Sequence, residues 1–184
     1  MRSRDEIKAF LKRMNRFDGS MVQKACEFAT FAHEGQLDKS GQEYVQHPTR
    51  VANALDKQYN DAIITTIAFM HDVIEEGNMT TSDLMLYFPE VVWKCVDILT
   101  RRNSLGRDDY IKKIGENFIT TKIKLADLED NMSIVGNNLK SDKDYERYDR
   151  YQKEFNYLSS RLAEFKTTLA ECEQDTETYA NFFM

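Results

Sequence analysis

The stretch that decides the fold is AIITTIAFMHDVIEE, residues 62–76. Its nearly unbroken apolar surface predicts a central, buried helix, with Asn60-Asp61 as its N-terminal cap and Gly77 as a left-handed C-terminal cap. His71 and Asp72 stand inside this run. A carboxylate among such apolar neighbours is costly to bury without a metal ion or a partner, so this doublet is the first candidate for a functional site.

Working outward from this segment, apolar residues recur at steps of three and four on both sides, which is typical of amphipathic helices. The polar stretches 36–46 and 101–110 predict exposed connections. In the long C-terminal segment one apolar stripe favours a helix packed on the core over a coiled-coil dimer. The expected helices are residues 4–16, 20–35, the segment from Pro48, 62–76, 80–88, 91–99, the segment from Thr120 to Gly136, and about 141–171.

The composition fits one compact domain. The chain has 184 residues, 41% of them hydrophobic, with only 7 Gly and 2 Pro, and no segment has the pattern of a convincing strand. We therefore predict an all-α fold, a helical bundle in a single domain. Residues 1–19 are expected to form an N-terminal helix and linker, and residues 20–175 the main domain with the 141–171 helix packed on it.

The charge and the cysteines limit the partners and the compartment. A net charge of −6 argues against nucleic acid as the main partner, whereas a small phosphorylated ligand needs only a few local cations. No apolar stretch is long enough to span a membrane, and the N-terminus lacks a signal-peptide pattern. Cys26, Cys95 and Cys172 form no CxxC pair and are expected to be buried and inert. We expect a cytoplasmic protein. The sequence does not indicate its oligomeric state.

Four residues form a candidate metal site. His47, His71, Asp72 and Asp127 provide a mixed nitrogen and oxygen donor set that suits a divalent cation of borderline hardness. They lie on separate segments, so they can meet only if the helices pack into a bundle around a polar pocket. Such a cation lowers the pKa of a bound water and polarises a phosphoryl oxygen, which favours a metal-dependent phosphohydrolase.

Other charged side chains could complete this chemistry. Glu75 and Glu76 follow His71 and Asp72 by four positions, so on a helix each pair shares a face, and the glutamates could hold the attacking water or accept its proton. Cations near the ligand segments could offset the charge of a substrate's phosphates. These cations are Lys39, Arg50, Lys122 and Lys124.

These residues resemble the hydrolase domain of the Rel/Spo-homologue alarmone enzymes, an HD-type family, and are close to its small stand-alone hydrolases. The resemblance covers roughly residues 20–170. The matching segments are AHEGQ (32–36), KSGQEYVQHP (39–48), HDVIEE (71–76), KLAD (124–127) and NM (131–132).

The resemblance implies an all-α HD-domain helical bundle with one Mn²⁺ ion, and removal of the 3′-pyrophosphate from (p)ppGpp. It makes residues 20–175 a metal-dependent phosphohydrolase domain. It implies His47, His71, Asp72 and Asp127 as the metal ligands, whereas His33 matches a position that does not bind the ion. The water-activating pair of the family falls on Glu75 and Glu76. Positions of the family's substrate pocket fall on Lys39, Ser40, Tyr44 and Asn131.

Several positions depart from the family pattern. Asp38 replaces an arginine that packs on the guanine base, and Glu76 replaces an aspartate. Ser133 and Ile134 replace an arginine and a threonine, so contacts to the nucleotide are altered while the metal ligands are intact. Two alternatives to (p)ppGpp hydrolysis follow: a phosphatase acting on NADPH or another phosphorylated nucleotide, and a nucleotide-binding module without turnover.

Overall fold

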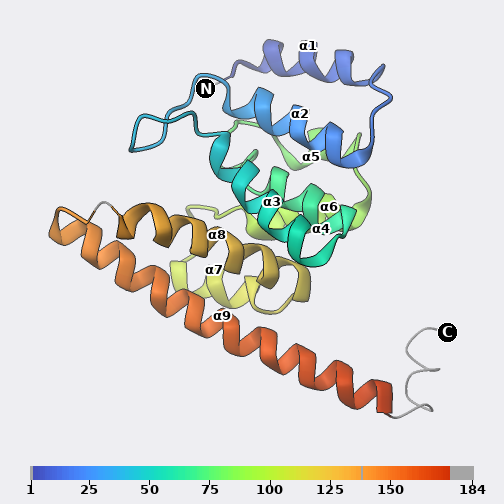
Figure 1. Ribbon diagram of the computed structural model, residues 1–184. Coiled ribbons are helices and arrows are strands. Elements are labelled where there is room, and N and C mark those ends of the chain that lie inside the picture. Colours follow the sequence, from blue (N-terminus) through green and yellow to red (C-terminus); the bar gives the residue numbers. More distant parts are fainter. Residues whose placement is uncertain (1, 138, 175–184) are drawn as a thin grey trace.

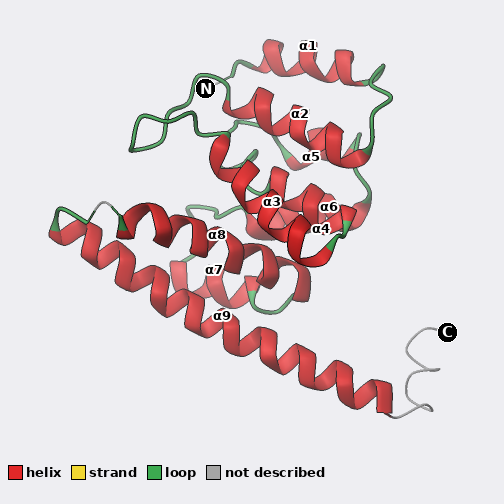
Figure 2. Ribbon diagram, viewed as in Figure 1, coloured by secondary structure: helices red, strands yellow, loops and turns green. Residues whose placement is uncertain are grey.

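The computed structural model describes residues 2–137 and 139–174, with side chains given up to residue 170. Within these ranges every regular element is a helix, which confirms the all-α class (Figure 2). Extended backbone pairs in one isolated bridge, between Leu37 and Glu43. The helices are α1 (Arg4–Met14), α2 (Met21–His33), α3 (Gln46–Tyr59), α4 (Ala62–Met70), α5 (Thr81–Met85), α6 (Glu90–Leu99), α7 (Arg107–Ile114), α8 (Phe118–Gly136) and α9 (Asp142–Gln174).

The helices stack in layers around α4 (Figure 1). Helix α1 lies over α2 at one end, α3 and α4 pack together in the middle, and α9 runs along α8 at the other end. The C-terminal half of α9 extends beyond α7 and α8. The layer formed by α3, α4 and α8 is therefore the interior of the bundle, and the candidate metal ligands come from these elements.

Side-chain caps fix where several helices begin. The Asp61 carboxylate accepts from the amides of Ile63 and Ile64 at 2.8 and 3.1 Å, as the sequence predicts. Ser20 and Thr80 each form a reciprocal capping box with the residue three positions later. Each cap satisfies amide groups that have no partner inside the helix, which stabilises the first turn.

A single apolar cluster holds the layers together. Every residue from Ile64 to Met70 is buried, so the predicted central helix is confirmed. Fully burying one such side chain contributes about 1.5–3 kcal/mol. Apolar residues of α1 belong to the same cluster, and the division at residue 19 stays a prediction. The largest fully buried apolar side chains include Ile7, Phe28, Leu55, Ile67, Met70, Leu84, Ile123, Leu128 and Leu158.

The predicted end of the central helix is wrong. Helix α4 ends at Met70, and residues 71–77 form successive turns. The ring nitrogen Nδ1 of His71 donates to the carbonyl of Ala68 at 2.7 Å, and that carbonyl is the acceptor that the next helical amide would use. The side chain of His71 thereby competes with the continuation of the helix.

Gly77 is also not the left-handed cap that the sequence predicts. The left-handed residue is Asn78, with φ of 64°, whereas Gly77 allows a close approach to α2. A Cβ atom at Gly77 would lie 2.5 Å from the carbonyl oxygen of Val73 and 2.6 Å from Cβ of Ala32. The glycine is therefore required by space and not by its backbone angles.

The segment 101–110 is only partly the exposed loop that was predicted, because α7 begins at Arg107. Tyr110 is buried and its hydroxyl donates to the carbonyl of Leu99. Arg107 makes two hydrogen bonds, of 2.6 and 2.8 Å, to the carboxylate of Glu154 on α9. These contacts tie the first turn of α7 to α6 and α9.

The apolar stripe of the long helix packs on the core over part of its length. Leu158 is fully buried, whereas Leu169 is 51% exposed where α9 extends beyond the bundle. Cys95 is buried as expected, but Cys26 is exposed on the outer face of α2, and the side chain of Cys172 lies outside the described residues. None of the described helices has the length and apolar character needed to cross a membrane.

Candidate metal centre

The structure brings the four predicted metal ligands together. His47 lies in the first turn of α3, His71 and Asp72 lie in the turn after α4, and Asp127 lies in the middle of α8. The Nε2 atom of His47 is 3.0 Å from Oδ1 of Asp127 and 3.7 Å from Oδ2 of Asp72. The Nε2 atom of His71 is 3.4 Å from Oδ2 of Asp72 and 3.8 Å from Oδ1 of Asp127.

Three of these side chains form a group that could hold a metal ion. One ligand atom each from His47, His71 and Asp127 lie within 4.8 Å of one another, and all three residues are buried. Because Nδ1 of His71 donates to a carbonyl, its Nε2 carries a lone pair. That Nε2 atom is buried and has no hydrogen-bond partner. A cation would satisfy it, so the donor set fits a divalent metal ion.

Asp72 lies at the edge of this group and is oriented by Tyr44. The Tyr44 hydroxyl donates to Oδ2 of Asp72 at 2.7 Å. Burial would raise the pKa of Asp72, but the neighbouring histidines and the Tyr44 hydrogen bond outweigh it and lower the pKa. Tyr44 was predicted to contact the substrate. Its hydroxyl donates to a predicted metal ligand, and its contact with substrate stays a prediction.

Asp127 is held by two neighbours on its own helix. Lys124 donates to Oδ2 at 2.6 Å, and the amide of Asn131 donates to Oδ1 at 2.6 Å. Although burial opposes ionisation, Lys124 and His47 keep the pKa of Asp127 well below its usual value. Lys124 was expected to face the substrate's phosphates, and Asn131 to bind the substrate. Both side chains bind Asp127.

Sequence reasoning missed Asp130. Its Oδ2 atom lies 2.7 Å from Nδ1 of His47, and Arg50 donates two hydrogen bonds to the same carboxylate, at 2.7 and 2.9 Å. Arg50 was expected to offset phosphate charge, but its guanidinium binds Asp130. The spacing from Asp127 to Asp130 is three residues, which places both on one face of α8 and could have identified Asp130.

The two glutamates predicted to activate water both line the cavity at the metal group. They lie in the turn after α4 and not on a helical face. Glu75 accepts from the amide of Arg101 at 2.8 Å, and the carbonyl of Glu76 accepts from the side chain of Gln36 at 2.8 Å. Partial burial, together with the charges of Asp72 and Glu75, raises the pKa of Glu76.

A groove leads from the metal group to the surface. The inner cavity, about 150 Å³, contains the metal group and is also lined by Arg101, Arg107 and Tyr110. An adjoining cavity of about 370 Å³ shares residues with it, including His47, Glu76 and Asn131. Its outer wall consists of Leu37, Asp38, Lys39, Ile134, Val135 and Arg147. The groove is large enough for a small ligand to reach the metal group.

The predicted loop residues lie at the outer end of this groove. Lys39 and Ser40 line a further cavity of about 460 Å³ with Arg147. Asp38 accepts hydrogen bonds from the amide and hydroxyl of Ser40, so its carboxylate stabilises its own loop. Lys122 lies elsewhere, with its ammonium about 4 Å from the rings of Tyr59 and Phe118. It is therefore not one of the cations of the groove.

The fold and the buried histidine–aspartate group define an all-helical domain with a candidate metal centre. No protein-family model matches the chain. The guanosine-3′,5′-bis(diphosphate) 3′-pyrophosphohydrolase of Vibrio cholerae is 35% identical over 116 residues, and the bifunctional (p)ppGpp synthase/hydrolase SpoT of Escherichia coli is 32% identical over 133 residues. The alignments cover 57% and 66% of this chain but 16% and 19% of those proteins, so the chain spans less than a fifth of their length.

A solved structure has the same fold. It is described as a metazoan ortholog of SpoT that hydrolyzes ppGpp, and it matches with a TM-score of 0.65 and 21% sequence identity. The match covers 80% of this chain and 94% of that chain. The sequence relatives thus confirm the resemblance to Rel/Spo-homologue hydrolases, and the solved structure confirms the fold.

Proposed function

We propose that this chain is a metal-dependent hydrolase that removes the 3′-pyrophosphate from (p)ppGpp. The observation that carries the proposal is the buried group of His47, His71 and Asp127, with the unpartnered Nε2 of His71, at the inner end of a groove. The names of the relatives supply the substrate class. We also propose residues 20–175 as the hydrolase domain and the cytoplasm, where nucleotide substrates occur, as its location.

In this proposal His47, His71, Asp72 and Asp127 hold one Mn²⁺ ion. Bound there, the ion would supply positive charge that polarises a phosphoryl oxygen and acidifies water. Tyr44 fixes the orientation of Asp72, and Lys124 and Asn131 fix that of Asp127. These hydrogen bonds keep the carboxylates ionised and aimed at the same point.

Glu75 and Glu76 orient the attacking water and accept its proton, because they line the cavity beside the metal group. The water oxygen forms a bond to the phosphorus attached to the 3′ oxygen. The bond between that phosphorus and the 3′ oxygen breaks, and the 3′ oxygen takes up a proton. The products are pyrophosphate and a nucleotide with a free 3′ hydroxyl.

The outer groove binds the rest of the nucleotide. Lys39 and Arg147 place two cations along it, and Ser40 adds a hydroxyl. These groups can offset the charge of the 5′ phosphates at a distance from the reacting phosphorus. Tyr44 and Asn131 line the same groove and act chiefly through the metal ligands that they bind.

The test of this function is direct. The purified chain with Mn²⁺ should release pyrophosphate from ppGpp, and Asp127→Asn should abolish both this release and Mn²⁺ binding. Glu76→Gln should keep Mn²⁺ binding and lower kcat about 10²- to 10⁴-fold, the usual contribution of a positioned base. Wild-type protein that releases no more pyrophosphate than Asp127→Asn would exclude this activity.

One lysine in the groove and one lysine outside it allow a matched control. Lys39→Met should raise KM for ppGpp, because Lys39 lines the outer groove. Lys122→Met removes the same charge from a residue on the rings of Tyr59 and Phe118, away from the groove, and should leave KM unchanged. Equal effects of the two substitutions would argue against phosphate binding by Lys39.

A second substrate is favoured by the outer wall of the groove. Ile134 and Val135 make part of this wall apolar, and the carboxylate of Asp38 is used by its own loop. NADPH or another phosphorylated nucleotide is therefore the alternative. A panel of nucleotides separates the two, because a phosphatase releases phosphate where a pyrophosphohydrolase releases pyrophosphate. Binding without multiple turnover of any nucleotide would indicate the non-catalytic module instead.

A further inference from the structure

Asp130, which Arg50 binds, lies on the Nδ1 side of the His47 ring. The Nδ1 atom of His47 lies 2.7 Å from Oδ2 of Asp130, on the side of the ring opposite to Nε2. Both residues of this hydrogen bond have mostly buried side chains. The Nε2 atom of the same ring faces the carboxylates of Asp127 and Asp72. His47 therefore bridges the metal group and a carboxylate that belongs to no predicted ligand set.

The hydrogen bond to Asp130 decides which nitrogen of His47 carries a proton. Both carboxylate oxygens of Asp130 accept hydrogen bonds from Arg50, so in the hydrogen bond to His47 the Nδ1 atom is the donor. In a neutral imidazole this leaves the lone pair on Nε2, the atom that faces the metal group. Carboxylates that receive a proton from a metal-binding histidine fix its tautomer and its ring orientation, and their loss typically weakens metal binding 10- to 100-fold.

Arg50 holds Asp130 in the position that this role requires. Its Nε and Nη2 atoms donate to Oδ1 and Oδ2 of Asp130 at 2.7 and 2.9 Å, a bidentate geometry that fixes the plane of the carboxylate. The carboxylate of Asp130 therefore accepts hydrogen bonds from both Arg50 and His47, and its orientation is fixed.

We propose that Asp130, oriented by Arg50, is a positioning residue that fixes His47 as a metal ligand and thereby sets the affinity of the site for its cation. This inference rests on the proposed metal site and concerns residues outside it. Asp130→Asn should reverse the direction of the hydrogen bond between residue 130 and His47. The amide oxygen would turn to the two donors of Arg50, and the amide nitrogen would then donate to Nδ1 of His47. That arrangement favours a proton on Nε2, where the metal ion would bind.

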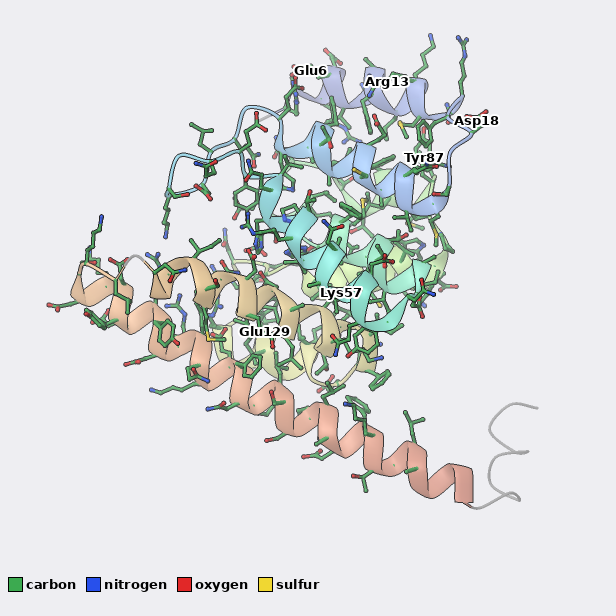
Figure 3. All side chains as sticks on the ribbon, viewed as in Figure 1. Glu6, Arg13, Asp18, Lys57, Tyr87 and Glu129 are labelled. Carbon is green, nitrogen blue, oxygen red and sulfur yellow. The ribbon has the colours of Figure 1, made fainter. Side chains whose placement is uncertain are left out.

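The experiment titrates the full chain with Mn²⁺ alone and measures free Mn²⁺ by electron paramagnetic resonance. Asp130→Asn should raise the dissociation constant about 10- to 100-fold. Arg50→Gln should raise it by less, and the double variant should bind no more weakly than Asp130→Asn, because both residues act through one hydrogen bond. The matched control is Glu129→Gln, which removes the same charge from the neighbouring, exposed position on α8 (Figure 3).

Thermal unfolding of the metal-free variants checks that they fold, and affinities are compared among variants that do. If wild type and Glu129→Gln bind Mn²⁺ tightly and Asp130→Asn binds within twofold of them, the role of Asp130 is excluded and the proposed metal site stands. If wild type itself binds no Mn²⁺, the proposed metal site fails, and this inference fails with it. Additive losses in the double variant would exclude a shared action through His47.

Discussion

At the scale of single residues, Tyr44 can act on metal binding, through Asp72, or on substrate binding, and the two roles can be separated. Its hydroxyl donates to Asp72, and such a bond to a charged group is worth about 1.5–3 kcal/mol. Tyr44→Phe should therefore weaken Mn²⁺ binding about 10-fold or more, measured by titration without substrate. A tyrosine that contacts only substrate would instead raise KM and leave Mn²⁺ affinity unchanged, and that result would contradict the role derived from the structure.

The same scale shows what the sequence could predict of the site. The proposed metal ligands are recognisable because histidine and aspartate within apolar runs are unusual, and because the resemblance gives the spacing. The partners of charged side chains were not predictable. Lys124, Arg50 and Lys122 have the same charge in the sequence, yet one binds Asp127, one binds Asp130 and one lies on aromatic rings. Only the packing of separate helices decides among these partners.

At the scale of helices and their caps, Asp83 joins α1 to α5. Its carboxylate accepts from the hydroxyl of Thr80, the N-cap residue of α5, and from both terminal nitrogens of Arg4 at 2.6 Å. The side chain of Asp83 is 4% exposed. Burial would raise the pKa of Asp83, but the bonds from Arg4 and Thr80 lower it. Asp83→Asn should therefore lower the free energy of unfolding at pH 7 by about 1–3 kcal/mol.

The lowered pKa of Asp83 determines how the loss of unfolding free energy in Asp83→Asn depends on pH. The stabilisation is complete above the unfolded-state pKa of about 3.9, and it is lost as the pH falls through the lower folded-state pKa. The difference between wild type and Asp83→Asn should be constant from pH 7 to pH 5 and shrink below about pH 4 in urea unfolding. Asp5→Asn, at an exposed site on α1, should stay within about 0.5 kcal/mol of wild type. A difference that grows with acidity would contradict the ionised role.

Helix ends were harder to predict than helices. The period of apolar residues identifies α4 because it depends on many positions at once. At its end, after Met70, the ring of His71 binds the carbonyl of Ala68, a contact that the sequence does not reveal. Likewise, the sequence of the first turn of α7 predicts a polar loop, but Arg107 in this turn binds Glu154, forty-seven positions later. In both cases a contact between individual groups overrides the local pattern.

At the scale of the whole molecule, the site depends on how the layers are joined. Its residues come from α3, the turn after α4, and α8. Helix α9 covers α8, contributes Arg147 and Tyr151 to the lining of the groove, and binds Arg107 through Glu154. The resemblance predicted this convergence, and the apolar stripe predicted that the last helix would pack on the core. Neither could indicate how far α9 extends beyond the bundle, because its stripe continues past the last residue that packs.

The docking of α9 provides the last prediction. Leu158 is fully buried against the common core, so Leu158→Ala should lower the free energy of unfolding by about 2–5 kcal/mol. Leu169→Ala makes the same change at a 51% exposed position of the same helix and should cost less than about 0.5 kcal/mol.

Trp93, the one tryptophan of the chain, lies on α6 and gives a fluorescence signal remote from α9. Because one cluster joins α6 to α9, the Trp93 transition and the loss of helical circular dichroism should shift together in Leu158→Ala. A circular dichroism shift that leaves the Trp93 transition unchanged would mean that α9 detaches separately, without unfolding the layers that hold the proposed metal ligands.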